Sequence, residues 1–168
     1  RRFHLPCMME NVFADGESYL RTKTVVEYDA YSLAPVRTAQ FLSDQVSNVI
    51  SAELDYIALQ PKQVIDINNN VSQTRFDPLG YVFVTSVFGT MQGARQGDMD
   101  LKDYEEVRAA GIADVLADPD KYIQGASSFF YYDLDSWRTE RQPCGFVHLI
   151  RETYAGAEGH GGEGDSGE

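Results

Sequence analysis

The chain has 168 residues, of which 43% are hydrophobic, and a formal net charge of -12 at pH 7. This length and hydrophobic content predict one domain or two very small ones. The acidity excludes nucleic acid and anionic membranes as partners, because both are negative and bind through basic surfaces. No apolar run approaches the roughly 18 residues of a membrane span, so direct membrane insertion is not expected. The start at Arg1 rather than Met is typical of a piece of a longer protein.

Strands are expected from Lys23 onward, and residues 1–22 are interpreted as an N-terminal extension. The run "TKTVVEYD" is rich in β-branched and aromatic residues and ends at Tyr28-Asp29. The extended run "YSLAPVRTAQF" follows after a short turn. Two such runs around a turn predict a β-hairpin.

The next unit, "NVISAELDYIALQPKQVIDI", repeats this arrangement with Leu54-Asp55 at the end of its first run. The two units align residue by residue, so that Asp29 matches Asp55, Leu33 matches Leu59, and Pro35 matches Pro61. Aspartate suits the turn, because its carboxylate can accept backbone N–H groups two residues on. The prolines are expected where a strand edge or a bulge tolerates a missing donor.

Two further units complete the series. In the third, Phe76-Asp77 leads into a Pro-Leu-Gly turn and the run "YVFVTSVFG", which ends at Gly89. Gly80 or Asn48 can supply a positive φ at such turns. In the fourth, "SSFFYYDLDSW" contains Tyr132-Asp133 and continues into "QPCGFVHLIRETY". The hairpins are expected at residues 23–89 and 127–154, in an antiparallel sheet of about six to eight strands whose units stack together.

Residues 90–126 are expected to insert a loop and short helices between the third and fourth units. The glycine-rich stretch up to residue 100 predicts a loop, and helices are expected only between residues 101 and 124. The spacing of Leu101, Tyr104 and Val107 predicts a helix that ends at Gly111. A second helical turn is expected over "IADVLA" and a third over "PDKYIQ", with Asp118 as N-cap and Pro119 as first residue. Residues 155–168 are rich in glycine and acids and predict a flexible tail.

The repeated phrase resembles the repeat of the Rhs/YD-repeat family, in which a strand ends in Tyr-Asp or Phe-Asp before a Gly-containing turn. A longer order is more specific: "VEYDAYSLAPVRT", "ELDYIALQPKQVIDINNN", "FDPLGYVFVTSVFG", "GD", "DPDKYIQGASSFFYYDLDSW" and "QPCGFVHLIRETY". These six phrases, over roughly Lys23 to Tyr154, are similar in sequence and spacing to a segment of bacterial insecticidal toxin-complex B components and of related SpvB-like and Rhs proteins. Two positions depart from the pattern: Tyr81 stands where the family usually has Arg, and Tyr154 stands where it usually has His.

The resemblance implies a mainly β protein built from antiparallel YD-repeat hairpins. In that family the B component and the N-terminal part of its C partner form a hollow shell that encloses a toxic effector. The implied role is a shell segment of a secreted or cell-surface virulence toxin. The implied partners are the rest of the parent chain, the C-type component with its effector, and, indirectly, the pore-forming A component. No enzymatic activity, cofactor or metal is expected.

Two alternatives remain open. The aromatic stretch 129–137, with Trp137, could hold a carbohydrate on a surface module, although aromatics at alternating strand positions are typical of a core and of cross-strand pairs. Asp77 begins a sequence similar to the family's self-cleavage motif, which would make the chain a hydrolase. That chemistry needs a second carboxylate nearby to share a proton, and Gly80 runs straight into another strand, so a turn is favoured.

Three other sets of residues are interpreted structurally. The acids at positions 98, 100 and 103 lack the glycine and closing Glu of a calcium loop and suit a helix N-terminus. Cys144 and His148 lie too far apart along an extended strand to act as nucleophile and base. With Cys7 so distant in sequence, both cysteines are expected to be unpaired and buried.

Overall fold

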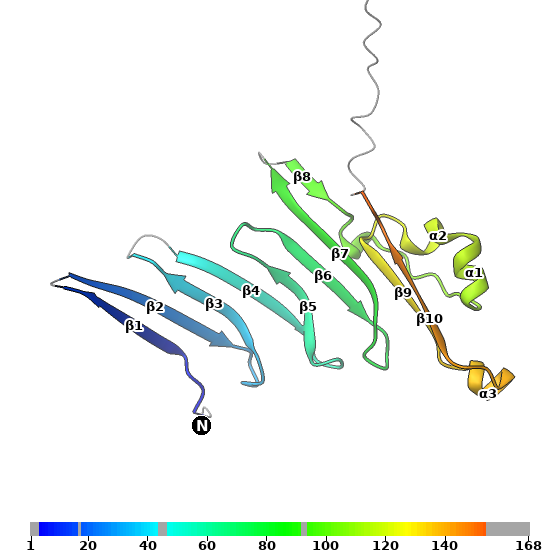
Figure 1. Cartoon of the computed structure of the whole chain (residues 1–168), viewed down its shortest axis with the longest axis horizontal. Helices are drawn as coiled ribbons and strands as arrows, with labels where there is room; N and C mark the ends of the chain where they lie inside the picture. Colours follow the sequence, from blue (N-terminus) through cyan, green and yellow to red (C-terminus); the bar gives the residue numbers. More distant parts are fainter. Residues whose placement is uncertain (1–3, 17, 44–46, 92–93, 154–168) are drawn as a thin grey trace, which may run out of the picture. The chain divides into compact units, whose positions relative to one another are not determined.

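The computed structural model describes residues 4–16, 18–43, 47–91 and 94–153 and is mainly antiparallel β-sheet (Figure 1), which confirms the expected fold class. The expected tail at residues 155–168 lies outside the described residues. The chain divides into two compact units, Arg1–Val71 and Ser72–Glu168. Within the described residues, no helix has the length and apolarity that crossing a membrane requires.

The first unit is a run of strands in which each pairs antiparallel with the next along the chain. They lie side by side in chain order (Figure 1). The strands are β1 (Met8–Asp15), β2 (Ser18–Tyr28), β3 (Pro35–Phe41), β4 (Ser47–Asp55) and β5 (Gln60–Ile65). The pairings of β2 with β3 and of β4 with β5 are the first two hairpins predicted from the sequence. Asn48 lies inside β4, so it does not supply a positive φ.

Residues 8–15 form β1 and residues 18–22 form the first part of β2, although the sequence predicts an extension before Lys23. In their register Met8 lies opposite Val25, and Phe13 lies opposite Leu20. Side chains alternate between the two faces along a strand, so the adjacent residues Met8 and Met9 point to opposite faces. Apolar residues on both faces hide the period of two by which a half-buried strand is recognised.

The two aligned prolines mark equivalent irregularities in the first two hairpins. The register shifts between Glu27 and Tyr28, where Tyr28 pairs with Pro35, and again between Glu53 and Leu54, where Leu54 pairs with Pro61. At each shift two residues of one strand face one residue of its partner, which is the arrangement of a β-bulge. Because a bulge leaves a residue outside the ladder, it tolerates the missing N–H of proline, as the sequence predicts.

The first unit has almost no buried core. Among its described residues only Ala39 and Asp29 are buried, at 1% and 8% exposure. Large apolar side chains such as Phe13 and Leu20 remain 57% and 60% exposed. The first unit is therefore a sheet held by strand pairing, without the packed interior that stabilises an independent domain.

The second unit contains the strands β6 (Val71–Phe76), β7 (Val82–Met91), β8 (Ala94–Gly97), β9 (Ser128–Asp133) and β10 (Gly145–Ile150). β7 pairs with both β8 and β9, and β9 pairs with β10, which is the predicted fourth hairpin. The described part of the chain thus has ten strands rather than six to eight. β8 was expected to be a loop. Its end requires glycine, because a Cβ on Gly97 would lie 2.8 Å from Phe88 Cα.

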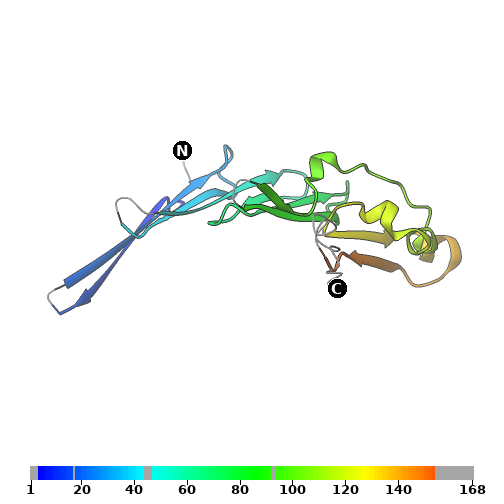
Figure 2. The same ribbon diagram turned by 90° about the horizontal axis from the view of Figure 1, so that it is seen from above.

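Two short helices and a packed core distinguish the second unit. Helices α1 (Ile112–Ala117) and α2 (Pro119–Ile123) contact β9 and β10 and lie on one face of these strands (Figure 2). Both helices were predicted, with Pro119 in the first turn of α2, although Asp118 makes no side-chain cap. The core between helices and strands consists of buried residues from these elements and from the segments that connect them, namely Val84, Leu101, Tyr104, Val115, Tyr122, Ile123, Ala126 and Phe129.

The helix predicted over residues 101–111 is absent. Only the 3₁₀ turn Leu101–Asp103 forms, and Gly111 precedes α1 instead of ending a helix. The backbone N–H of Leu101 donates to the Gln73 side chain at 2.8 Å, and the Leu101 carbonyl accepts from Arg75. The Leu101 carbonyl is a group that an α-helix would pair internally, and here it accepts from Arg75 of β6 instead, so tertiary contacts override the helical spacing.

A third helix, α3 (Ser136–Glu140), lies between β9 and β10, outside the segment where helices were expected. The amides of Arg138 and Thr139 both donate to the carbonyl of Asp135, and Arg141 ends the helix in the left-handed conformation. From the sequence, this stretch is expected to be part of the strand and its turn. The helix is too short for a hydrophobic period to reveal it.

Candidate functional site: the aspartate turns of neighbouring hairpins

An aspartate begins five turns of the described chain, and each carboxylate accepts backbone N–H groups from the residues that follow it. Every one accepts from the residue two positions on, the geometry of an Asx turn. The five are Asp29, Asp55, Asp66, Asp77 and Asp133. The repeated strand, aspartate and turn of the sequence is therefore a repeated hydrogen-bonding unit.

Asp29 has the most complete set of partners. Its carboxylate accepts the amides of Tyr31, Leu33 and Ala34 at 3.0, 2.7 and 2.9 Å. The N–H bond from Ala34, followed by those from Tyr31 and Leu33, holds the pKa of the Asp29 carboxyl below its usual value, although burial opposes this. The turn therefore favours an ionised aspartate.

Asp55 and Asp77 are the matching residues of the next two predicted units. Asp55 accepts the amides of Ile57 and Ala58 at 2.8 and 2.9 Å. Asp77 accepts those of Leu79 and Tyr81 at 2.9 and 2.8 Å. In the latter turn Gly80 has a φ of 86°, a conformation that glycine adopts at little steric cost.

Asp133 and Asp66 use side-chain partners as well. Asp133 accepts the amide of Ser136 at 3.0 Å and also its hydroxyl, and the hydroxyl bond is the main cause of a lowered pKa of the Asp133 carboxyl. Asp66 accepts the side-chain amide of Asn70 at 2.9 Å, which likewise lowers the pKa of Asp66. Asp66 was not among the predicted repeat residues; its signal in the sequence is Asp66-Ile67 followed by a run of asparagines.

The residues that directly precede the aspartates make different contacts. The Tyr28 hydroxyl donates to the carbonyl of Pro6 at 3.2 Å, which ties the start of the chain to β2. Leu54 lines a pocket described below. Phe76 ends β6. The ring of Tyr132 lies 5.2 Å from that of Tyr81, measured between centroids. These positions share a place in the strand rather than a common chemistry.

The turn that begins at Asp29 and the turn that begins at Asp55, the first two aspartate turns, contact each other directly. The rings of Tyr31 and Tyr56 meet edge to face with centroids 5.3 Å apart. The Tyr56 hydroxyl donates to Asp29 at 3.3 Å, so a residue of the second turn completes the carboxylate of the first. Burial and the Asp29 charge raise the pKa of Tyr56, which keeps its hydroxyl protonated as a donor.

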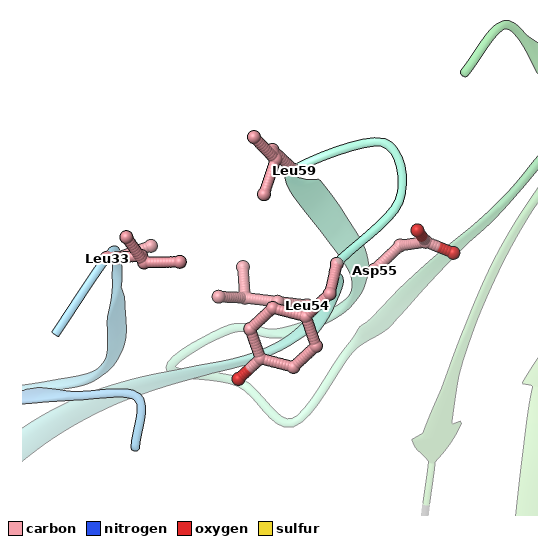
Figure 3. Close-up of a pocket in the computed structure, with 6 residues that line it drawn as sticks. Leu33, Leu54, Asp55 and Leu59 are labelled. Carbon is pink, nitrogen blue, oxygen red and sulfur yellow. The ribbon is translucent and has the colours of Figure 1, made fainter. Parts of the chain in front are cut away.

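A small apolar pocket lies between these two turns. Its volume is about 190 Å³, and it is lined by Leu33, Ala34, Leu54, Asp55, Tyr56 and Leu59. The side chains of Leu33, Leu54 and Leu59 point toward one another, whereas the Asp55 carboxylate points away from them (Figure 3). Because that carboxylate already accepts two turn amides, the pocket offers an apolar surface and no free charged group.

The aromatic stretch 129–137 is divided between two faces of the second unit. Phe129 is 5% exposed and packs against Tyr122 in the core. Phe130 stacks on His148 with ring centroids 4.1 Å apart, on the alternate face of the strand. Trp137 lies in α3 and is 59% exposed. The stretch therefore divides its rings between the core and the alternate face, where Phe130 and Tyr132 stack on each other.

The remaining candidate residues have structural partners. Asp100 accepts the amide of Lys102 at 3.1 Å and so caps the 3₁₀ turn, and Asp98 accepts from the Ser127 hydroxyl. Nowhere in the described ranges do three or more His, Cys, Asp or Glu side chains gather as they would around a metal ion. Cys7 and Cys144 are unpaired, as expected, but both are exposed rather than buried.

Comparison with solved structures identifies the fold. A crystal structure of TcdB2-TccC3 matches 82% of this chain with a TM-score of 0.63 and 22% sequence identity. The Tc holotoxin pore of Photorhabdus luminescens and a further TcdB2-TccC3 crystal structure each match 68% of the chain, with a TM-score of 0.54 and identities of 22% and 23%. The fold is that of a segment of a Tc toxin complex.

The match covers only a small part of these much larger proteins. This chain spans 6% of the first matched chain and 5% of the other two. No protein-family model matches the sequence. No curated protein matches it either. The expected resemblance to the toxin-complex B component is therefore confirmed at the level of the fold.

Proposed function

We propose that this chain is a stretch of wall in a hollow Rhs-type β-shell, which encloses an effector polypeptide within a secreted toxin complex. Its partners are then the rest of the parent chain, a C-type component and the effector that this component carries. The pore-forming A component is an indirect partner. In this role the chain binds and confines, and it performs no chemistry and needs no cofactor.

The observation that carries this proposal is the open sheet of the first unit. Five consecutive antiparallel strands leave only Ala39 and Asp29 buried among the described residues. A sheet normally buries at least one face against another layer. A wall that is continued and covered by the rest of a larger assembly has no such need, and the fold match to a segment of a Tc toxin complex supports this explanation.

The aspartate turns explain how such a wall is kept regular. Each turn uses one carboxylate to fix the backbone of the reversal, and a tyrosine of one hairpin reaches the aspartate of the preceding hairpin. Among the described residues this contact between hairpins occurs once, from Tyr56 to Asp29. The aspartate turns themselves recur, and stacking of such units extends the sheet one unit at a time.

A carbohydrate-binding module is not favoured. Phe129 is buried in the core, and on the alternate face the ring of Phe130 is stacked on that of His148 with centroids 4.1 Å apart, so these rings are engaged in contacts within the unit. The exposed ring of Trp137 lies within 5.9 Å of the Arg141 guanidinium, measured to the ring centroid. The stretch 129–137 thus serves packing within the unit.

The proposal is tested by protease protection of the effector. The full parent protein is produced with its C-type partner and digested under native conditions, and we expect the effector to remain intact. Val84→Asp places a charge at a position with 0% exposure and should open the wall, whereas Val87→Asp alters a 49% exposed residue of the same strand and should not. Complete digestion of the effector inside the unaltered complex would contradict the proposal.

A further inference from the structure

The pocket between the first two aspartate turns is a second feature of the first unit that calls for a partner. Around it, apolar side chains are strongly exposed: Leu33 is 65% exposed, Ile57 81% and Leu59 70%. Contiguous exposed apolar residues of this kind mark an interaction site in a soluble protein. The pocket volume of about 190 Å³ is below the roughly 300 to 1,000 Å³ of sites for small-molecule ligands.

The geometry points to one occupant. We propose that the pocket receives the leucine of another aspartate turn, supplied by a further hairpin of the parent shell, so that turn packs on turn along the hairpin ends. This inference rests on the proposed wall function and names a contact within it. The exposed leucine side chain of the other turn would fill the pocket.

The first reason is that the chain already builds one contact of this type. Tyr56 of the second turn packs on Tyr31 of the first and bonds to Asp29. Ile57 and Leu59 of that second turn then remain exposed, beside the pocket. A further turn that packs there would continue an interface that the structure shows between the first two.

The second reason is that one aspartate turn of this chain, the Asp77 turn, presents a leucine outward. Leu79, two residues after Asp77, is 70% exposed. Its amide is held by the Asp77 carboxylate at 2.9 Å, so the turn backbone is fixed before any partner arrives. A fixed turn loses little conformational freedom on binding, which favours a contact through a single apolar side chain.

The third reason is chemical complementarity. Asp55 is the charged residue of the pocket lining, and its carboxylate accepts the amides of Ile57 and Ala58. A charged or strongly polar occupant would find no free partner in the pocket and would lose its hydration. An aliphatic side chain has no such cost and gains from burial, at roughly 25 cal/mol per Å² of apolar surface.

The test is an NMR titration of the full chain, at low salt and low protein concentration, with a cyclised peptide of residues 74–84 that presents Leu79. Cyclisation is needed because an isolated hairpin is only marginally stable in water. We expect saturable shifts of the amides of residues 31–34 and 54–59. The same peptide with Leu79→Ser should bind at least about tenfold more weakly, since most of its buried apolar surface is gone.

A filled pocket provides the matched control in the protein. Ala34→Leu places a larger side chain in the pocket while its backbone N–H can still donate to Asp29, and it should abolish the response. Ala113→Leu, an equal substitution in α1 of the second unit, away from the pocket lining, should leave it unchanged. Equal shifts with both peptides, or no shifts at all, would overturn the inference.

One other result would also overturn it. Shifts at residues 31–34 and 54–59 that grow with protein concentration in the absence of peptide, and that Ala34→Leu removes, would show a second copy of this chain as the occupant. None of these outcomes decides the wall function, because a shell can enclose its effector whether or not this pocket is filled. The protease experiment tests that function separately.

Discussion

The hydroxyl of Tyr56 donates a hydrogen bond of 3.3 Å to the carboxylate of Asp29, so the second hairpin completes the turn of the first. This bond is distinct from the backbone pairing of β3 with β4, which also joins the two hairpins. Backbone pairing is independent of side-chain identity, whereas the Tyr56 contact requires a donor at this position. The alignment of these two hairpins is therefore fixed by a side-chain hydrogen bond as well as by backbone pairing.

We predict that Tyr56 and Asp29 are energetically coupled. Asp29→Asn should lower the free energy of unfolding more than Tyr56→Phe does, because it replaces a carboxylate that accepts three amides and a hydroxyl with a neutral amide. In the Asp29→Asn background, Tyr56→Phe should cost less than it does alone. Urea unfolding of the two single variants and the double variant measures this, and strictly additive effects would show that the bond does not form.

Acid should weaken the first turn. The folded-state pKa of Asp29 lies below its ordinary value of 3.8, chiefly because of the Ala34 amide. Its contribution to stability is therefore present above about pH 3.8 and is lost as the pH falls through the lowered folded-state value. The difference in unfolding free energy between the unaltered 168-residue chain and its Asp29→Asn variant should be constant from pH 7 to 5 and should shrink below pH 3.8.

Glu152→Gln, at an exposed carboxylate, provides the control for this acid effect. The difference in unfolding free energy between this variant and the unaltered chain should stay close to zero over the same range. A difference for Asp29→Asn that is unchanged at the lowest pH would mean that the charge of the carboxylate does not hold the turn.

Gln73 should hold the segment that follows β8. It accepts the Leu101 amide at 2.8 Å and donates to Asp100 at 3.1 Å. Gln73→Leu leaves the Leu101 N–H buried without its acceptor, which costs about 1 to 3 kcal/mol. Hydrogen exchange of the Leu101 amide should accelerate strongly, whereas Ser72→Ala on the exposed side of the same strand should not change it. Unaltered protection in Gln73→Leu would contradict this role.

Truncating an aromatic side chain should destabilise the chain strongly on one face of β9 and β10 and only slightly on the other. Phe129 is 5% exposed and belongs to the core, so Phe129→Ala should destabilise the chain by about 3 to 5 kcal/mol. Phe146 is 66% exposed, and Phe146→Ala should change the stability by no more than about 0.5 kcal/mol. Chemical unfolding followed by circular dichroism compares them. Similar losses for both would mean that the second face is also covered.

The hairpins were predictable because the residues that fix each turn lie within the turn itself. The alignment of Asp29 with Asp55 rests on local chemistry, since an aspartate can satisfy the amides of its own turn. The matching prolines point to a bulge for an equally local reason, the missing N–H. Both features appear at the same places in the two hairpins, at Pro35 and Pro61.

Other parts of the structure depend on contacts that no local pattern contains. Leu101 and Tyr104 have helical spacing, yet Gln73 and Arg75 of a distant strand bind the backbone there, and only a 3₁₀ turn forms. The pocket depends on residues from two turns, and nothing local to Leu33 indicates that Leu59 lies near it. Asp66 differs, because its turn is local and a search for aspartates with asparagine two residues later would have found it.

The central claim is that the first unit is an open sheet, completed by neighbours in a larger shell. The most direct test is sedimentation of the isolated chain at low and high salt, together with binding of a dye that reports apolar surface. Exposed apolar faces and unpaired strand edges favour association, while the net charge of -12 opposes it. Salt screens that repulsion beyond about 8 to 10 Å. We predict dye binding and association that increases with salt; a clean monomer at both salt concentrations, with no dye-accessible surface, would contradict the claim.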